Sequence, residues 1–144
     1  MVFIVESGST KADWILLDAS ANEVGRWSVK GLNPYFHDSD EVERTLRAES
    51  AIMGHAPHVE KVFFYGAGCS SEPLNAIIAA GLERVFPNAQ VLVDHDLLAA
   101  AYATFFGEPH IACILGTGSN SCYFDGTSVR EEVPALAYIL GDEG

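Results

Sequence analysis

The sequence predicts an α/β fold in which a mixed β-sheet is covered by helices on both faces. Two patterns predict this fold. Three short apolar segments separated by turns open the chain, and helical and strand-like segments then alternate. Hydrophobic residues make up 49% of the 144 residues, which is enough to build a packed core.

The opening segments predict a three-stranded antiparallel meander. Residues 2–5 and 14–17 are apolar runs, and residues 24–29 alternate between apolar and polar side chains. Polar turns at residues 6–11 and at Asn22-Glu23 separate these segments. We therefore expect three consecutive strands that pair with their neighbours along the chain.

The rest of the chain predicts helices that alternate with strands, followed by a second group of strands. Ser39 or Asp40 would cap the first helix. The expected helices cover residues 39–53, 72–85 and 96–106, and the expected strands cover 61–65, 90–93, 111–115, 121–124 and the region near Val129. Gly107-Glu108-Pro109 is the clearest linker, so we expect two domains, residues 1–107 and 108–144.

Charge and composition exclude several classes of partner. The formal net charge is −12, with 8 basic and 20 acidic residues, and no basic stripe favours nucleic acid or an acidic membrane surface. Glu6 interrupts the apolar start, which argues against a signal peptide, and the apolar run 97–106 is too short to span a bilayer. The three cysteines show neither a disulfide framework nor metal-ligand spacing. We expect a cytoplasmic protein with no nucleic-acid or membrane partner.

Two hairpin turns have the composition of phosphate-binding sites. In Glu6-Ser7-Gly8-Ser9-Thr10-Lys11, glycine allows close backbone approach, the hydroxyl groups can donate hydrogen bonds, and the lysine adds positive charge. Gly116-Thr117-Gly118-Ser119-Asn120 repeats the pattern after a second strand, which suggests a duplicated domain. Each could instead be an ordinary polar turn, but two such turns in one chain favour the binding of phosphate.

Two polar residues are candidates for substrate binding. Asp96 follows a predicted strand and begins a predicted helix, which is where α/β sheets place their ligands. It would be either a helix cap or a general base that removes a proton from a hydroxyl group. Asn33 precedes Pro34 and would be either a turn residue or a partner of a sugar hydroxyl. We expect Trp14 in the core, and the five histidines, which form no ligand pattern, at the surface or in caps.

These motifs together resemble those of a known superfamily. The hairpin with Gly8, Ser9 and Thr10 resembles the first phosphate motif of the actin, hexokinase and heat-shock chaperone ATPases. Gly116-Thr117-Gly118-Ser119-Asn120 resembles the second phosphate motif, and Gly141-Asp142-Glu143-Gly144 resembles a turn of the N-acetylglucosamine kinases. The benzoyl-CoA reductase activator ATPases share this signature. The motif order and spacing cover the whole chain, as in the N-terminal half of such a kinase.

The resemblance implies a ribonuclease-H-like, actin-like ATPase fold of two lobes, with ATP and Mg²⁺ in the cleft between them. It implies a five-stranded mixed sheet flanked by helices in the first lobe and the opening strands of the second. The implied phosphate-binding residues are Gly8, Ser9, Thr10, Lys11, Thr117 and Gly118, and the implied sugar-binding residues are Asn33, Asp96, Ser119, Asn120 and Asp142. Asp96 would be the catalytic base, and Glu6 would hold Mg²⁺ directly or through water.

Two departures from the family pattern are present. The first motif usually opens with aspartate, and here Glu6 is one methylene longer. The Trp-Gly pair that precedes the acidic turn in the family is Leu136-Ala137 here, which bears on the identity of the sugar.

The expected function is an ATP-dependent sugar kinase that phosphorylates N-acetylglucosamine or a related amino sugar at its 6-hydroxyl group. One alternative is an ATPase activator of a reductase, for which Cys69 would be the only placed cluster ligand, although we expect it to be a buried small residue. Another is a non-catalytic sugar-sensing protein. We expect the 144 residues alone to be inactive and the strands after Pro109 to be covered by a homodimer or by the first lobe.

Overall fold

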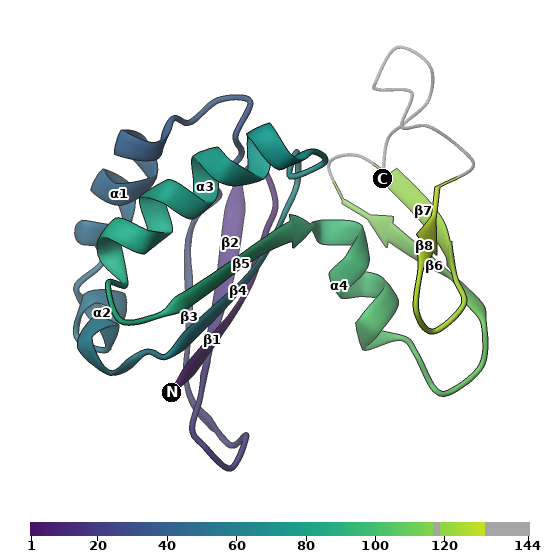
Figure 1. The fold of residues 1–144 in the computed structure, drawn as a ribbon, viewed down its shortest axis with the longest axis horizontal. Coiled ribbons are helices and arrows are strands. Elements are labelled where there is room, and N and C mark those ends of the chain that lie inside the picture. The colour runs from purple at the N-terminus through teal and green to yellow at the C-terminus, as the bar shows by residue number, and fades with distance from the viewer. Residues whose placement is uncertain (117–118, 132–144) are drawn as a thin grey trace. The chain divides into compact units, whose positions relative to one another are not determined.

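The computed structural model describes residues 1–116 and 119–131 (Figure 1). The chain divides into two compact units, one from Met1 to Asp96 and one that starts at Leu97. These units are not the predicted domains 1–107 and 108–144, which are the expected lobes of a larger fold. The predicted domain bounds stay a prediction. No helix in the described ranges is both long and apolar enough to cross a lipid bilayer.

A five-stranded sheet with the order β3-β2-β1-β4-β5 forms the first unit (Figure 1). Its strands are β1 (Val2–Ser7), β2 (Lys11–Leu17), β3 (Glu23–Lys30), β4 (Lys61–Gly66) and β5 (Gln90–His95). β2 is antiparallel to both β1 and β3, whereas β4 is parallel to both β1 and β5. The predicted meander and the predicted mixed sheet are therefore confirmed.

The first predicted helix, over residues 39–53, is wrong in two respects. It divides into α1 (Ser39–Arg47) and α2 (Ser50–Met53), and its cap is Asp38, whose Oδ1 accepts a hydrogen bond from the Glu41 N–H at 2.8 Å. The apolar spacing explains the division. A continued helix would present polar residues 49 and 50 to the core one turn after Leu46, whereas the break buries Ile52 completely.

Helix α3 (Glu72–Val85) has the predicted bounds, whereas α4 (Asp96–Ala103) ends three residues before the predicted position. A single turn of 3₁₀-helix, Ala56–His58, leads into β4. Helices α1 and α3 pack against each other, and Gly81 allows the close approach because a Cβ there would lie 2.5 Å from the Val42 Cβ.

The helices of the first unit cover one face of its sheet, so the prediction of helices on both faces is wrong for this unit. Phe3, Val5 and Trp14 are fully buried under the helices, whereas Ile4 and Leu92 on the opposite face are 37% and 41% exposed. Successive right-handed crossovers that move in one direction along a sheet place their helices on the same face. The order β1-β4-β5 contains no reversal that would move a helix to the other face.

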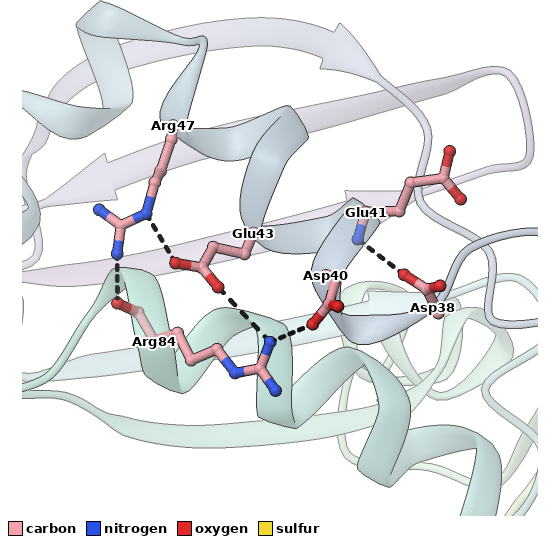
Figure 2. A network of polar contacts seen from close by, with 6 residues as sticks. All are labelled: Asp38, Asp40, Glu41, Glu43, Arg47 and Arg84. Carbon is pink, nitrogen blue, oxygen red and sulfur yellow. Dashed lines mark hydrogen bonds and ion pairs between the residues drawn. The ribbon is translucent and has the colours of Figure 1, made fainter.

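Charged side chains connect α1 to α3 at the surface. Figure 2 shows Arg84 of α3 between the carboxylates of Asp40 and Glu43 of α1, and Arg47 of α1 donates to the Arg84 carbonyl oxygen at 3.0 Å. These pairs are exposed and contribute little individually. The apolar layer beneath them carries the stability of this contact.

The second unit contains α4 and a three-stranded antiparallel sheet, β6-β7-β8. The strands are β6 (His110–Leu115), β7 (Ser119–Phe124) and β8 (Val129–Arg130), close to the predicted positions. Its core contains Leu97, Ala101, Ala112, Cys122 and Phe124. At the hairpin turn, Asp125 accepts hydrogen bonds from the N–H groups of Ser128 and Thr127, which lower its pKa.

Candidate functional site

The hairpin between β1 and β2 is braced by the segment that follows β3. The Gly8 N–H donates to the Lys11 carbonyl oxygen at 2.9 Å and closes the turn. The Gly31 N–H donates to the Thr10 carbonyl oxygen at 3.0 Å, and Gly31 packs against the hairpin backbone. The turn predicted to bind phosphate is therefore supported from behind by a second loop.

Ser7 fastens the end of β1 to the same segment. Its buried hydroxyl accepts a hydrogen bond from the Leu32 N–H at 2.9 Å and lies 3.1 Å from the Leu32 carbonyl oxygen, to which it can donate. Sequence reasoning missed both Ser7 and Gly31 as supporting residues. Strand alternation from Phe3 and Val5 places Ser7 on the buried face, and this signal was available in the sequence.

Asn33 joins this segment directly to the phosphate hairpin. Its side chain is in contact with Ser9, with the Nδ2 atom 3.1 Å from the Ser9 Oγ atom, and its Oδ1 atom accepts the Tyr35 N–H at 2.9 Å. Asn33 is 6% exposed, and its own N–H lies 3.2 Å from Nδ1 of His37. His37 is buried, so of its two expected positions, at the surface or in a cap, the surface position is wrong; its Nδ1 atom also lies 3.1 Å from the Asn33 carbonyl oxygen.

Two carboxylates, Glu6 and Asp96, act on each other electrostatically. Asp96 is the first residue of α4, directly after β5, and its side chain is 17% exposed. Partial burial of Glu6 raises the pKa of its carboxyl group above the usual value, and the negative charges of Asp96 and Asp13 raise that pKa further. His95 lies beside Asp96, with Nε2 3.4 Å from the Asp96 Oδ1 atom.

Lys11 supplies the positive charge of the hairpin. Its Nζ atom lies 2.7 Å from a carboxylate oxygen of Asp13. The hydrogen bond and charge of Asp13 raise the pKa of Lys11, and the same hydrogen bond lowers the pKa of Asp13. Lys11 is exposed and stays protonated at neutral pH.

The turn after β4 closes over Asn33. Gly68 has a φ angle of +82°, and a Cβ atom there would lie 2.6 Å from the Asn33 Oδ1 atom, so glycine is needed for both conformation and space. Cys69 is buried, as expected, and burial together with the charges of Asp96 and Asp94 raises the pKa of its thiol to about 12. In residues 1–116 and 119–131, no group of three His, Cys, Asp or Glu side chains is arranged to hold a metal ion.

The other predicted site residues fall in the second unit or beyond the described ranges. Ser119 begins β7, and the Asn120 Oδ1 atom accepts the Ser121 N–H at 2.8 Å. Thr117, Gly118 and Asp142 lie outside the described residues. The structure thus brings Ser9 and Asn33 into contact and Glu6 and Asp96 into electrostatic interaction, and the ligand-binding roles of all these residues stay predictions.

Comparison with solved structures gives a close match over nearly the whole chain. The chain is 41% identical to a Porphyromonas gingivalis protein described as a "putative N-acetylglucosamine kinase", with a TM-score of 0.90. The match covers 99% of this chain and 50% of that one, so the chain spans about half the length of its relative. No protein-family model and no curated protein matches the chain.

More distant structures share the fold. A ROK family glucokinase from Streptomyces griseus, in complex with glucose and AMPPNP, has a TM-score of 0.61 at 21% identity, over 94% of this chain and 48% of that one. A polyphosphate/ATP-glucomannokinase from Arthrobacter has a TM-score of 0.60 at 20% identity, over 92% and 61% of the two chains. The resemblance read from the motifs is thus confirmed: over nearly its whole length the chain is similar to one half of a protein described as a putative N-acetylglucosamine kinase, and it shares its fold with sugar kinases.

Proposed function

We propose that the protein containing this chain is an ATP-dependent kinase that phosphorylates N-acetylglucosamine or a related amino sugar at the 6-hydroxyl group. One observation carries the proposal: the chain is 41% identical over nearly its whole length to a protein described as a putative N-acetylglucosamine kinase. The geometry supports it, because a braced glycine–hydroxyl hairpin follows β1 and a partly buried aspartate follows β5.

The hairpin of β1 and β2 would bind the phosphate groups of ATP. Gly8 leaves the backbone open, Ser9 and Thr10 present hydroxyl donors, and Lys11 contributes a charge that attracts an anion. The chain carries a net charge of −12, so the binding energy has to come from these local donors rather than from the overall field of the protein.

Glu6 fits a role in holding Mg²⁺. Desolvation of Glu6 raises the pKa of its carboxyl group, and the negative charges of Asp96 and Asp13 raise that pKa further, so a divalent cation nearby would relieve the repulsion among the three carboxylates. Mg²⁺ prefers one or two carboxylates together with water and substrate phosphates, which agrees with a site that lacks three protein ligands among the described residues. When bound, the ion would neutralise charge on the transferring phosphoryl group.

Asp96 would act as the general base. As the sugar O6–phosphorus bond forms, the bond from the γ-phosphorus to the β–γ bridging oxygen breaks and ADP leaves. The Asp96 carboxylate would accept the proton of the 6-hydroxyl group. Its position at the start of α4, with the ring of His95 beside it, limits the directions in which the carboxylate can point.

A coupled assay of ADP release tests the proposal. The intact protein would be incubated with Mg-ATP and a panel of sugars: N-acetylglucosamine, N-acetylmannosamine, glucosamine and glucose. We expect sugar-dependent turnover that is highest with an amino sugar, together with a sugar 6-phosphate product identified by mass spectrometry. Sugar binding without turnover would identify the non-catalytic sensor instead. We also expect the intact protein to be cytoplasmic. The strands after Pro109 would be covered either by a homodimer or by packing against the first lobe.

A further inference from the structure

We propose that Asn33 orients the Ser9 hydroxyl group so that its proton is available to a bound phosphate. The inference rests on the proposed binding of ATP at the hairpin of β1 and β2. It assigns Asn33 a positioning role that acts through Ser9 and is separate from any contact with the sugar.

The orientation of the Asn33 amide group follows from its neighbour. The Tyr35 backbone N–H lies 2.9 Å from one end of the amide, and a backbone N–H can only donate. That end must therefore be the acceptor, Oδ1, which leaves the Nδ2 group facing the Ser9 Oγ atom at 3.1 Å. The assignment rests on hydrogen-bonding chemistry, the only basis on which the two ends can be distinguished.

The amide orientation determines the role of the Ser9 hydroxyl group. The NH₂ group of asparagine is a donor, so the Ser9 oxygen accepts and its own proton cannot point back at Asn33. Among the described residues the Ser9 hydroxyl group donates no hydrogen bond, and Ser9 is exposed on the hairpin. The hydroxyl group is thus held as an outward donor, which is the polarity that a phosphate oxygen needs.

Asn33 is itself held rigidly. The Nδ1 atom of the buried His37 ring lies 3.2 Å from the Asn33 nitrogen and 3.1 Å from the Asn33 carbonyl oxygen, so either tautomer of the ring can bond to the Asn33 backbone. The absence of a side chain at Gly68 gives room for Oδ1. The hairpin is braced independently through Gly31. A donor fixed before the ligand arrives costs little reorganisation when an anion binds.

Substitution Asn33→Asp tests the inference with almost no change in shape. The aspartate keeps an acceptor for the Tyr35 N–H but replaces the Nδ2 donor with an oxygen, so the Ser9 proton would turn toward residue 33. We expect the intact protein to bind Mg-ATP about tenfold more weakly or worse, measured by isothermal titration calorimetry without sugar.

A double-mutant cycle with Ser9→Ala separates this effect from the added negative charge. Asn33→Asp should weaken Mg-ATP binding much less in the Ser9→Ala background, where only charge repulsion remains. If Asn33→Asp fails to fold, as judged by circular dichroism, Asn33→Ala replaces it in the same cycle. We then expect a smaller loss of Mg-ATP affinity, which again disappears in the Ser9→Ala background.

The outcomes distinguish this inference from the proposed function. A wild-type protein that does not bind Mg-ATP would overturn both. Suppose instead that the wild type binds Mg-ATP normally and that the Asn33 substitution lowers Mg-ATP affinity equally with and without Ser9→Ala. That result would overturn the orienting role alone. Unchanged affinity in a folded Asn33→Asp protein would overturn it as well.

Discussion

Gly31 lies against the carbonyl oxygen of Gly8 with no room for a side chain between them. A Cβ atom at residue 31 would collide with that oxygen and would lie 2.8 Å from both the Lys11 nitrogen and the Ser9 carbonyl carbon. The loop after β3 therefore determines where the hairpin of β1 and β2 sits. Two segments that are distant in the sequence form a single support for the proposed phosphate site.

Substitution Gly31→Ala should displace this hairpin. The added methyl group has backbone atoms on three sides, so we expect a loss of about 1–3 kcal/mol in the free energy of unfolding, measured by urea denaturation. Mg-ATP affinity should also fall. Gly54→Ala is the matched control, because its Cβ would meet nothing closer than 3.5 Å. Equal effects of the two substitutions would contradict the bracing role.

Substitution Glu6→Gln should stabilise the ligand-free protein at neutral pH. The pKa of Glu6 is higher in the folded state than in the unfolded state. Between these two pKa values the folded state binds more protons, so the free energy of unfolding falls as pH rises through this window. Glutamine removes this loss, and the wild type and the variant should become equally stable at low pH. Thermal midpoints measured between pH 4 and pH 8 check the expectation, and a constant difference across this range would contradict it.

The same substitution should weaken Mg-ATP binding on the order of tenfold or more, because a neutral amide is a poorer ligand for the ion. Calorimetric titration with Mg-ATP, and with ATP in the presence of a chelator, would measure the change. A Glu6→Gln protein that is more stable yet binds Mg-ATP normally would remove Glu6 from the proposed metal site.

Substitution Asp96→Asn should lower kcat about 100-fold or more while KM for the sugar changes modestly. The amide keeps the shape and the hydrogen-bonding capacity but cannot accept the proton. Asp94→Asn is the control, since the Asp94 side chain accepts the His95 N–H and has no assigned role in the reaction. Steady-state kinetics on the intact protein decide the matter: near-normal kcat for Asp96→Asn would exclude it as the base.

Thiol labelling should distinguish the buried Cys69 from the exposed Cys113. With a pKa of about 12, only about one Cys69 thiol in ten thousand is ionised at pH 8, and the group is also buried. Cys113 is exposed and should react with iodoacetamide in the native protein, whereas Cys69 should react after unfolding. Mass spectrometry of digested samples would measure both. Fast labelling of native Cys69, or iron in the purified protein, would favour the alternative function as an ATPase activator of a reductase.

The secondary structure was predictable wherever a local pattern decides it. Alternation and turn residues predict the meander, and it is present. The break between α1 and α2 was missed because both segments have good helical composition. Only the need to bury Ile52 on the sheet shows why the helix stops at Arg47.

The sequence by itself determined the order of elements, the glycine–hydroxyl motifs and the family resemblance, because these depend on residues close together in the chain. Only the tertiary structure decided that Asn33 bonds to Ser9, 24 residues away, and that Asp96 acts on the pKa of Glu6. Hydrogen bonds and charge interactions of this kind depend on which strand ends share a sheet edge. The parallel pairing of β1 with β4 and of β4 with β5 places Glu6 and Asp96 at one edge, and the antiparallel pairing of β2 with β1 and β3 returns the end of β3 to the hairpin that contains Ser9.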